Sequence, residues 1–244
     1  MNTQENPFLP ASPGATGSRH PPRGDFLAGG RRVPASHGPQ WLLRGWTMFR
    51  MAPGTWMTIA AAFMVLTLVV SASRLLNIGV NLLIPVFIGG VCIGCRAIED
   101  GQGIRFTHLL AGFTRKPRGL LLVGLLYMLA VMLLAVTVGV VVALSRSGNS
   151  LLPLLTAVLL FVPLAMAFWL APPLVVFHDF SALAALRTSF VVAWRNFPPF
   201  LFYGALVLCA AVIASLPLLL GWLVLLPVLY ASQYAFYCDV FFEQ

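Results

Sequence analysis

Leu120–Leu144 reads LLLVGLLYMLAVMLLAVTVGVVVAL, a run without one charged side chain. About 20 helical residues cross the hydrocarbon core of a bilayer, so this run is long enough to span a membrane. The strands of a membrane β-barrel alternate polar and apolar residues, and no such alternation occurs here. The run therefore predicts a transmembrane helix.

The rest of the chain has the same character. Of 244 residues, 59% are hydrophobic and 9% are charged, against about 45–50% and about 25% in soluble domains. Because so few polar side chains cannot coat a soluble globule, the composition predicts an all-α polytopic membrane bundle. Six transmembrane helices are expected, at Thr55–Ala72, Leu75–Cys95, Leu120–Leu144, Leu151–Phe177, Phe200–Leu216 and Leu220–Cys238.

Very short links join these segments in pairs, and each pair predicts a helical hairpin. Longer polar connections separate the hairpins and contain amphipathic stretches, which predict surface helices on the cytoplasmic side. The links are Ser73–Arg74, Ser145–Ser150 and Pro217–Leu219. The surface helices are expected at Trp41–Arg50, within Arg96–Gly119 and within His178–Pro199. The last of them has an apolar stripe at helical spacing, formed by Leu183, Leu186, Phe190 and Trp194, with Arg187 and Arg195 off the stripe.

An aromatic residue, an arginine and a proline recur at the mouth of each hairpin, and an aspartate follows each hairpin. This order favours an internal repeat of three units. The alternative is coincidence, because these residue types are common wherever a helix enters a membrane. The recurring residues are Phe49, Arg50 and Pro53, then Phe113, Arg115 and Pro117, then Trp194, Arg195 and Pro198, with the aspartates Asp100, Asp179 and Asp239.

Proline and glycine predict two irregular regions. The fourth segment contains Pro153, Pro163, Pro172 and Pro173, so its helix should be kinked or broken. Residues 1–40 contain 7 Pro and 6 Gly, so we expect a disordered cytoplasmic arm there and a transmembrane domain over residues 41–244. The arm does not resemble a signal peptide, because no apolar stretch precedes Trp41.

The basic residues predict the orientation. Of the 15 Lys and Arg residues, 13 lie in the N-terminal region or in the long connections, and only Arg74 and Arg146 lie on the other side. The positive-inside rule then places both termini and the hairpin mouths in the cytoplasm. No nucleic-acid partner is expected, because the basic residues lie next to membrane-spanning segments.

Anionic lipid headgroups are the expected partner. The candidate contacts are Arg115, Lys116 and Arg118, which cluster where the third span begins. Each juxtamembrane basic residue contributes about 1 kcal/mol to binding of an anionic membrane surface. The alternative is that the cluster only fixes topology and has no specific ligand.

Other polar residues form two candidate groups. The inner-rim polar cluster contains Arg96, Glu99, Asp100, His108, His178 and Asp179. Arg96 and Asp100 have the spacing of an intrahelical ion pair. A His–Asp couple could relay protons or bind a cation, and the alternative is charge placement where helices meet water.

Inside the spans, Asn77 and Asn81 stand one helical turn apart, so they either bond across the bundle or contact a substrate. Gln233, with Tyr230, Tyr234 and Tyr237, reads as part of an interfacial aromatic belt. Gly90 and Gly94 have the spacing that lets helices pack closely, within the bundle or at a homodimer interface.

No catalytic, cofactor or metal site is expected. The sequence contains no nucleophile elbow, HExxH motif or phosphate-binding glycine loop. Cys92 and Cys95 match C-x-x-C, but no second pair or nearby histidine completes a metal site. We therefore do not expect an enzyme.

Two stretches carry a resemblance, Arg96–Phe113 and Phe168–Asp179, together with the Trp46, Phe49 and Pro53 spacing. With these features the chain resembles an uncharacterised family of polytopic inner-membrane proteins from proteobacteria. More distantly, the hairpin pattern is similar to the membrane domain of some glycerophosphodiester phosphodiesterases. The resemblance implies a bacterial inner-membrane location and no activity.

The sequence thus favours a non-enzymatic membrane protein that organises or senses lipid or partner proteins at its cytoplasmic rim. The alternative is a small transporter or channel with a site near the broken fourth helix, since discontinuous helices often mark binding sites. A homo-oligomer is compatible with either hypothesis. A membrane-embedded hydrolase would need a nucleophile or metal cluster that the sequence does not offer.

Overall fold

The structure is a computed structural model that describes residues 24–145, 151–217 and 220–243. Most of the described residues lie in helices, and six helical segments are long and apolar enough to cross a membrane, as the sequence predicts. The elements in chain order are α1 (His37–Met51), α2 (Pro53–Ser71), α3 (Arg74–Glu99), the 3-10 helix η1 (Phe106–Leu110), α4 (Ala111–Thr114), α5 (Pro117–Leu144), α6 (Leu151–Trp169), α7 (Ala171–His178), α8 (Ala182–Arg195), α9 (Phe197–Ser215) and α10 (Trp222–Phe241).

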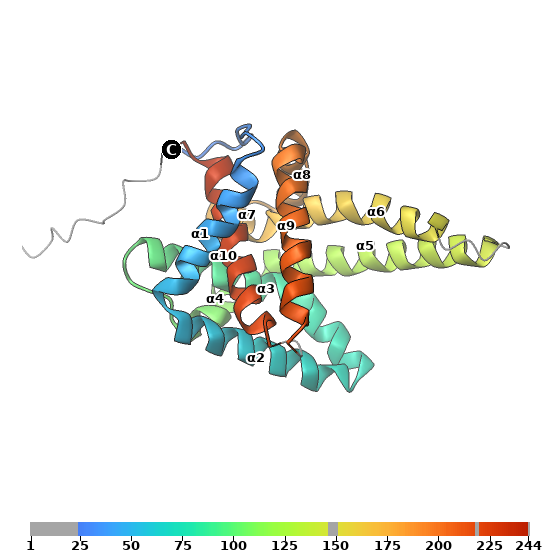
Figure 1. Cartoon of the computed structure of the whole chain (residues 1–244), viewed down its shortest axis with the longest axis horizontal. Coiled ribbons are helices and arrows are strands. Elements are labelled where there is room, and N and C mark those ends of the chain that lie inside the picture. Colours follow the sequence, from blue (N-terminus) through green and yellow to red (C-terminus); the bar gives the residue numbers. More distant parts are fainter. Residues whose placement is uncertain (1–23, 146–150, 218–219, 244) are drawn as a thin grey trace, which may run out of the picture.

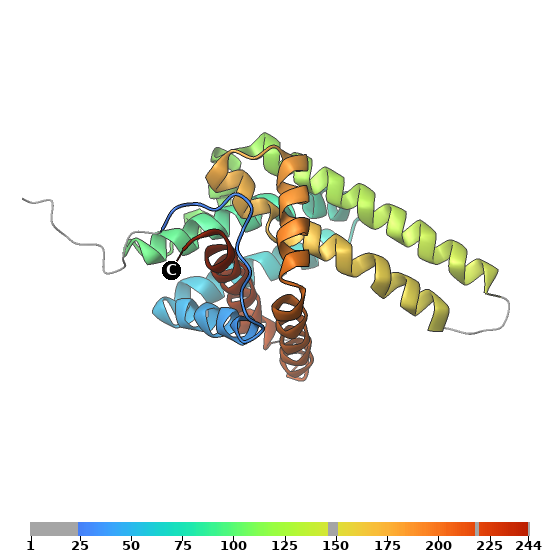
Figure 2. The same cartoon turned by 90° about the horizontal axis from the view of Figure 1, so that it is seen from above.

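The long helices pack in the three predicted pairs, α2 with α3, α5 with α6, and α9 with α10. The hairpins do not form one parallel bundle. Figures 1 and 2 show α5 and α6 projecting sideways from the other helices as an arm of their own. For two of the predicted links, only the first residue belongs to the described part of the chain. These are Ser145 of the link Ser145–Ser150 and Pro217 of the link Pro217–Leu219.

We define the rim as the end of the molecule where the three hairpins open. It comprises α1, η1, α4 and α8, and the adjoining ends of α3, α5, α7, α9 and α10. A helical rim segment followed by a hairpin occurs three times along the described chain. This order agrees with the predicted repeat, which stays a prediction.

The core of the molecule surrounds α10, which packs against α1, α2, α3 and α9. Its Tyr234, Phe236, Tyr237 and Phe241 are fully buried. The predicted surface helix Trp41–Arg50 is present as α1, but its apolar face lies against α10 rather than only against the membrane. A Cβ at Gly45 would lie 2.5 Å from the backbone oxygen of Val228, so glycine is what allows this close approach.

The sequence predicts a disordered arm over residues 1–40, but from Gly24 onward the structure shows a segment packed against the rest of the molecule. Residues 24–36, which we call the strap, lie against the C-terminal end of α10 and pair with it through an isolated bridge between Phe26 and Phe242. The backbone N–H of Leu27 donates to the oxygen of Phe241 at 2.9 Å. Long-range contacts thus order a segment whose composition alone predicts disorder, while residues 1–23 lie outside the described residues.

The other two surface helices also differ from expectation. The Arg96–Gly119 connection forms the short helices η1 and α4 instead of one amphipathic helix. In α8 the predicted apolar stripe is divided, because Leu186 is buried whereas Leu183 and Trp194 are exposed. Small residues such as Ala185 and Ser189 form the buried face instead, packed against α6 and α7.

The predicted break in the fourth segment lies at Leu170, just before Pro172 and Pro173, and separates α6 from α7. Buried side chains satisfy the backbone groups that the break leaves unpaired. The N–H of Leu170 donates to Ser189 Oγ at 3.0 Å, and Ser189 Oγ donates to the oxygen of Met166. The amide of Gln233 donates to the oxygen of Trp169. Gln233 is therefore buried at the helix break, and its prediction as part of an interfacial belt was wrong.

Candidate functional site

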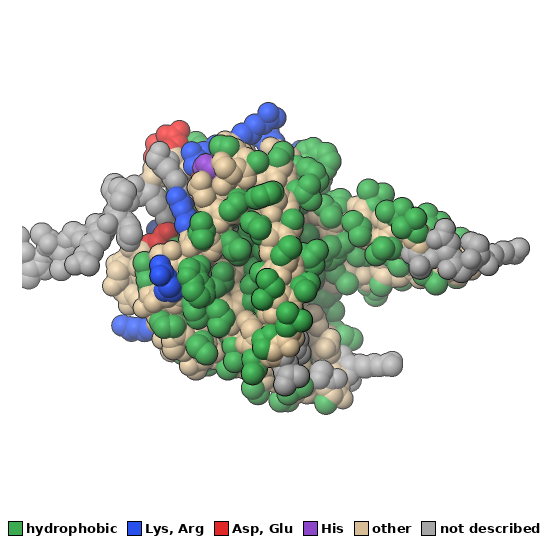
Figure 3. Space-filling view, viewed as in Figure 1, with side chains coloured by type: hydrophobic (Ala, Val, Ile, Leu, Met, Phe, Trp, Pro, Cys, Tyr) green, Lys and Arg blue, Asp and Glu red, His purple; other side chains and the backbone are tan. Residues whose placement is uncertain are grey.

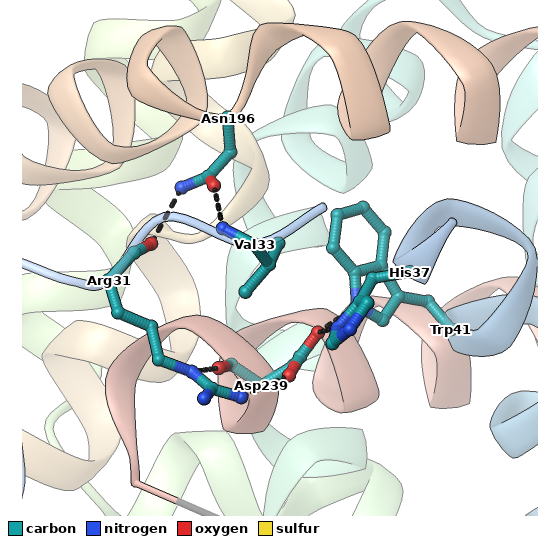
Figure 4. Close-up of polar contacts among 6 residues, drawn as sticks. All are labelled: Arg31, Val33, His37, Trp41, Asn196 and Asp239. Atoms are coloured by element: carbon teal, nitrogen blue, oxygen red, sulfur yellow. Dashed lines mark hydrogen bonds and ion pairs between the residues drawn. The ribbon is translucent and has the colours of Figure 1, made fainter. Parts of the chain in front are cut away.

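A polar network of the rim surrounds Asp239, near the C-terminal end of α10 (Figure 4). Its side chain is 3% exposed. One carboxylate oxygen is 2.7 Å from Arg31 Nη2. The other accepts from Trp41 Nε1 at 2.8 Å and lies 2.7 Å from His37 Nδ1. A buried carboxylate thus joins α10 to both the strap and α1.

Asn196 holds the strap from the opposite side, at the junction of α8 and α9 (Figure 4). Its side-chain oxygen accepts from the N–H of Val33 at 2.8 Å, and its side-chain nitrogen donates to the backbone oxygen of Arg31 at 3.0 Å. Asn196 is buried. Sequence reasoning missed Arg31, His37 and Asn196; the only signal was that Asp239 recurs with Asp100 and Asp179 after each hairpin.

The predicted inner-rim cluster is divided among several partners. Arg96 and Asp100 form the expected ion pair at 4.0 Å, with both side chains about half exposed. Arg96 also lies over the ring of Phe177 at 5.4 Å. Glu99 accepts a hydrogen bond from the hydroxyl of Tyr234 at 2.9 Å. These contacts hold the end of α3 against α7 and α10.

His178 and Asp179 are engaged separately, although they are neighbours in sequence. His178 Nε2 lies 2.5 Å from the hydroxyl of Tyr237, and its ring stacks on Phe26 of the strap. Asp179 forms an ion pair with Lys116. The two neighbours thus contact different parts of the rim, and the predicted His–Asp couple stays a prediction.

His108 lies in η1, where its Nδ1 accepts from the backbone N–H of Arg105 at 3.0 Å. Partial burial lowers the pKa of His108, and the charge of Arg105 lowers it further. Both effects favour the neutral ring, which is the form that accepts this hydrogen bond.

The predicted lipid contacts lie where α5 begins. Arg115 and Arg118 are exposed, whereas Lys116 contacts Asp179. Lys116 has a left-handed backbone conformation with φ 60°. Two further exposed cations, Arg187 and Arg195, lie on α8. On the face drawn in Figure 3, Lys and Arg side chains gather over the body of the molecule and not over the described part of the projecting α5–α6 arm.

The intramembrane pair Asn77 and Asn81 bonds within α3 rather than across the bundle. The side-chain nitrogen of Asn81 donates to both the side-chain and the backbone oxygen of Asn77, each at 2.8 Å. Neither side chain is buried. The predicted interhelical role is therefore not what the structure shows.

A crevice of about 320 Å³ lies between α3, α5, α6 and α10, beside the helix break. Asn81, Tyr127, Trp169 and Tyr230 line it, together with mostly apolar side chains. The indole N–H of Trp169 is buried, and no described residue accepts a hydrogen bond from it. Polar groups thus reach this crevice, but no charged side chain lines it.

Within the described ranges, no three His, Cys, Asp or Glu residues gather in a way that could hold a metal ion. Cys92 and Cys95 are fully buried in the hydrophobic core. Nearby, a Cβ at Gly90 would lie 2.4 Å from the oxygen of His108, so the Gly90–Gly94 face packs against η1 inside this chain.

No protein-family model and no solved structure matches the chain. The chain is 30% identical over 227 residues to a protein of Burkholderia thailandensis named "Probable inner membrane protein". The match covers 83% of this chain and 82% of that relative. The distant similarity to the membrane domain of phosphodiesterases stays a prediction. With six described helical segments able to cross a bilayer, the chain belongs to the same family of integral inner-membrane proteins as this Burkholderia protein.

Proposed function

We propose that this protein is a non-enzymatic inner-membrane protein whose cytoplasmic rim binds anionic lipid headgroups and so organises or senses the surrounding lipid. The observation that carries the proposal is the position of the exposed cations. Arg50, Arg115, Arg118, Arg187 and Arg195 all lie on rim elements. Basic residues at the cytoplasmic surface of a membrane attract anionic lipid, at about 1 kcal/mol each.

The start of α5 supports a headgroup site. Arg115 precedes the first turn of α5 and Arg118 lies within it, where backbone N–H groups also favour anions. Asp179 neutralises Lys116 in part, so the two arginines supply most of the available charge. A phosphodiester at this position would meet cations without burying either partner.

The contacts of the rim histidine and carboxylate side chains support a non-enzymatic role. Asp239 is enclosed by Arg31, His37 and Trp41, and His178 contacts Tyr237. A general base needs a reactive partner within hydrogen-bond reach. These two groups instead hold helices and the strap together.

The test is to purify the protein in native-lipid particles and to quantify the retained lipids by mass spectrometry. Changing Arg115, Lys116 and Arg118 together to Gln should lower the enrichment of anionic lipid over the bulk membrane. The matched control changes Arg19, Arg23 and Arg146 to Gln, which removes the same net charge at positions outside the start of α5, α8 and the strap.

An equal effect of both triple variants would show only a general charge effect and would contradict a site at α5. Bulk lipid composition around the unchanged protein would contradict lipid binding altogether. A co-purifying protein that is lost only with the α5 variant would replace the lipid by a protein partner.

A second candidate function is transport, favoured by the crevice beside the break between α6 and α7. Broken helices form the substrate sites of many transporters. The test places a cysteine at Ala165, which lines the crevice, in a Cys209→Ala background. Labelling by a small charged thiol reagent from both sides of the membrane would support transport. Labelling by lipid-soluble reagents only would favour a structural crevice.

A further inference from the structure

An open groove of about 630 Å³ runs along the exposed face of α8 and is bounded on one side by the strap. Arg187, Thr188 and Arg195 line it from α8, and Ala28 and Gly29 line it from the strap. These residues were not among the lipid contacts expected from the sequence. The groove is a second basic surface of the rim, formed by residues other than those at the start of α5.

Both guanidinium groups of the groove are available to a ligand. Neither Arg187 nor Arg195 forms an ion pair with any residue that the structure describes. Arg195 gives one hydrogen bond to the backbone oxygen of Gly29 at 3.2 Å. A guanidinium has five N–H donors, so most of its capacity remains. Helix α8 itself contains no Asp or Glu.

The groove has hydroxyl donors beside these cations. Thr188, the residue after Arg187, also lines the groove, and no described residue forms a hydrogen bond with its hydroxyl. A phosphate takes several charge-assisted hydrogen bonds at once, and arginine is well shaped for them. The set of donors therefore suits a phosphodiester.

Apolar side chains beside the cations indicate where this surface lies. Leu183 is 72% exposed and Trp194 is 60% exposed, and both lie on the same face of α8 as Arg187. Because the opposite face is buried against α6 and α7, the helix cannot turn these side chains inward. Arginine next to exposed Leu and Trp is typical of a helix at the boundary between headgroups and acyl chains.

The strap completes the groove, and specific contacts hold it there. A Cβ on Gly30 would lie 2.8 Å from Val192 Cγ2, and Gly30 has a φ of +62°. The strap thus touches α8 at a position that only glycine fits without strain. By contrast, a Cβ on Gly29 would meet nothing closer than Arg195 Nη1 at 3.9 Å.

We infer that α8 and the strap together bind the phosphate of an anionic membrane phospholipid, with Arg187, Arg195 and Thr188 as donors. This inference rests on the proposed lipid-binding function and names a site for it. Trp194 and Leu183 lie among the acyl chains, and Gly30 acts as a positioning residue through the strap. Asn196 and Asp239 both hold the strap beside α8 and α10, so the folded N-terminal segment is part of the site.

The test measures binding of phosphatidylglycerol to the full chain by native mass spectrometry, from particles of phosphatidylglycerol and phosphatidylethanolamine. The double variant Arg187→Gln/Arg195→Gln should weaken phosphatidylglycerol binding about 10- to 30-fold. Gly30→Ala should weaken it about 3- to 10-fold, because it displaces the strap. Gly101→Ala is the matched control and should bind as the unchanged protein does, because Gly101 also has a positive φ, of +74°, but lies outside the groove and its Cβ would meet nothing within 4 Å.

The melting temperature of each variant shows whether it is folded. Unchanged binding in the folded double variant would overturn the inference, and the proposed function would survive if the α5 variant still lost lipid. If the double variant lost phosphatidylglycerol binding while Gly30→Ala kept it in full, the strap would not be part of the site. Displacement of the lipid by inorganic phosphate alone would overturn the assignment to a membrane phospholipid.

Discussion

Two regions of the molecule are held together in opposite ways. One is the corner where α10 meets the strap, and the other is the arm formed by α5 and α6. Most of the α10 span is buried, and its Gln233 and Asp239 each contact another element. In α5 the buried residues are Leu120, Val123 and Gly124, all near its start, and in α6 Met166 is the buried residue. Toward the hairpin tip, the described side chains of α5 and α6 are exposed or half-buried.

This difference separates two kinds of stabilisation. In lipid, an apolar helix needs no apolar partner, because hydrocarbon chains solvate its side chains as well as another helix would. The arm is therefore specified by length and hydropathy. The α10 corner is specified by hydrogen bonds and close contacts between segments far apart in sequence.

The largest effect is expected from Gly124→Leu, near the start of α5. A Cβ there would lie 2.1 Å from the backbone oxygen of Leu82, so α3 and α5 must separate. We expect a loss of about 3 kcal/mol or more in the free energy of unfolding. The control is Gly139→Leu on the same helix, where nothing lies within 4 Å. It should change stability by less than about 1 kcal/mol. Thermal unfolding in lipid particles measures both, and equal effects would contradict the contrast.

Asp239→Asn should have the next largest effect, because it removes the charge that Arg31 and His37 share. A loss of about 2–3 kcal/mol is expected for hydrogen bonds to a buried charge. Asp100→Asn is the control, since its ion pair with Arg96 is exposed and contributes less than about 1 kcal/mol. Limited trypsin digestion gives a second readout. Cleavage after Arg32 should accelerate in Asp239→Asn alone, and an equal rate in both variants would show that Asp239 does not hold the strap.

Gln233→Leu should have a smaller effect, through the helix break. It leaves the backbone oxygen of Trp169 without the amide that now donates to it, at a cost of about 1–3 kcal/mol. Asn81→Leu is the control. Its side chain bonds only within α3 in the described contacts, so its removal should cost at most about 0.6 kcal/mol. Chemical unfolding in mixed micelles compares the two. A larger cost for Asn81 would restore the interhelical role first predicted for it.

The smallest effect is expected from protonation of His108. Its pKa is lowered in the fold by burial and by Arg105, while the unfolded chain takes up its proton near pH 6.5. Stability should therefore be full above pH 6.5 and fall below it, because the unfolded state binds the proton more tightly. Melting temperatures at about one unit on either side of pH 6.5 measure this fall. His108→Gln should flatten it; an unchanged slope would assign the dependence to another group.

The sequence predicts those parts of the fold that depend on local composition. The six spans follow from apolar length, and the break at Leu170 follows from Pro172 and Pro173. The Arg96–Asp100 pair follows from spacing along one helix.

The strap and its contacts could not be predicted in this way. Arg31 meets Asp239 across 208 positions of sequence, and Val33 meets Asn196 across 163. Proline and glycine in the strap lower local order, and contacts with residues far away in sequence, such as these two, restore it. The face of α8 was misread for a related reason, since close packing selected Ala185 and Ser189, while the larger Leu183 and Trp194 remained outside.

The central claim is that the rim, with its strap and exposed arginines, faces the cytoplasm, while the hairpin tips face the opposite side. Labelling of single cysteines in intact cells with a membrane-impermeant maleimide tests it most directly. The background is Cys209→Ala, because the other three thiols are buried. Gln102→Cys lies at the rim, and Ser147→Cys lies in the link between the third and fourth spans. We predict that Ser147→Cys is labelled from outside and that Gln102→Cys is labelled only after the membrane is opened. The reverse pattern would contradict the account.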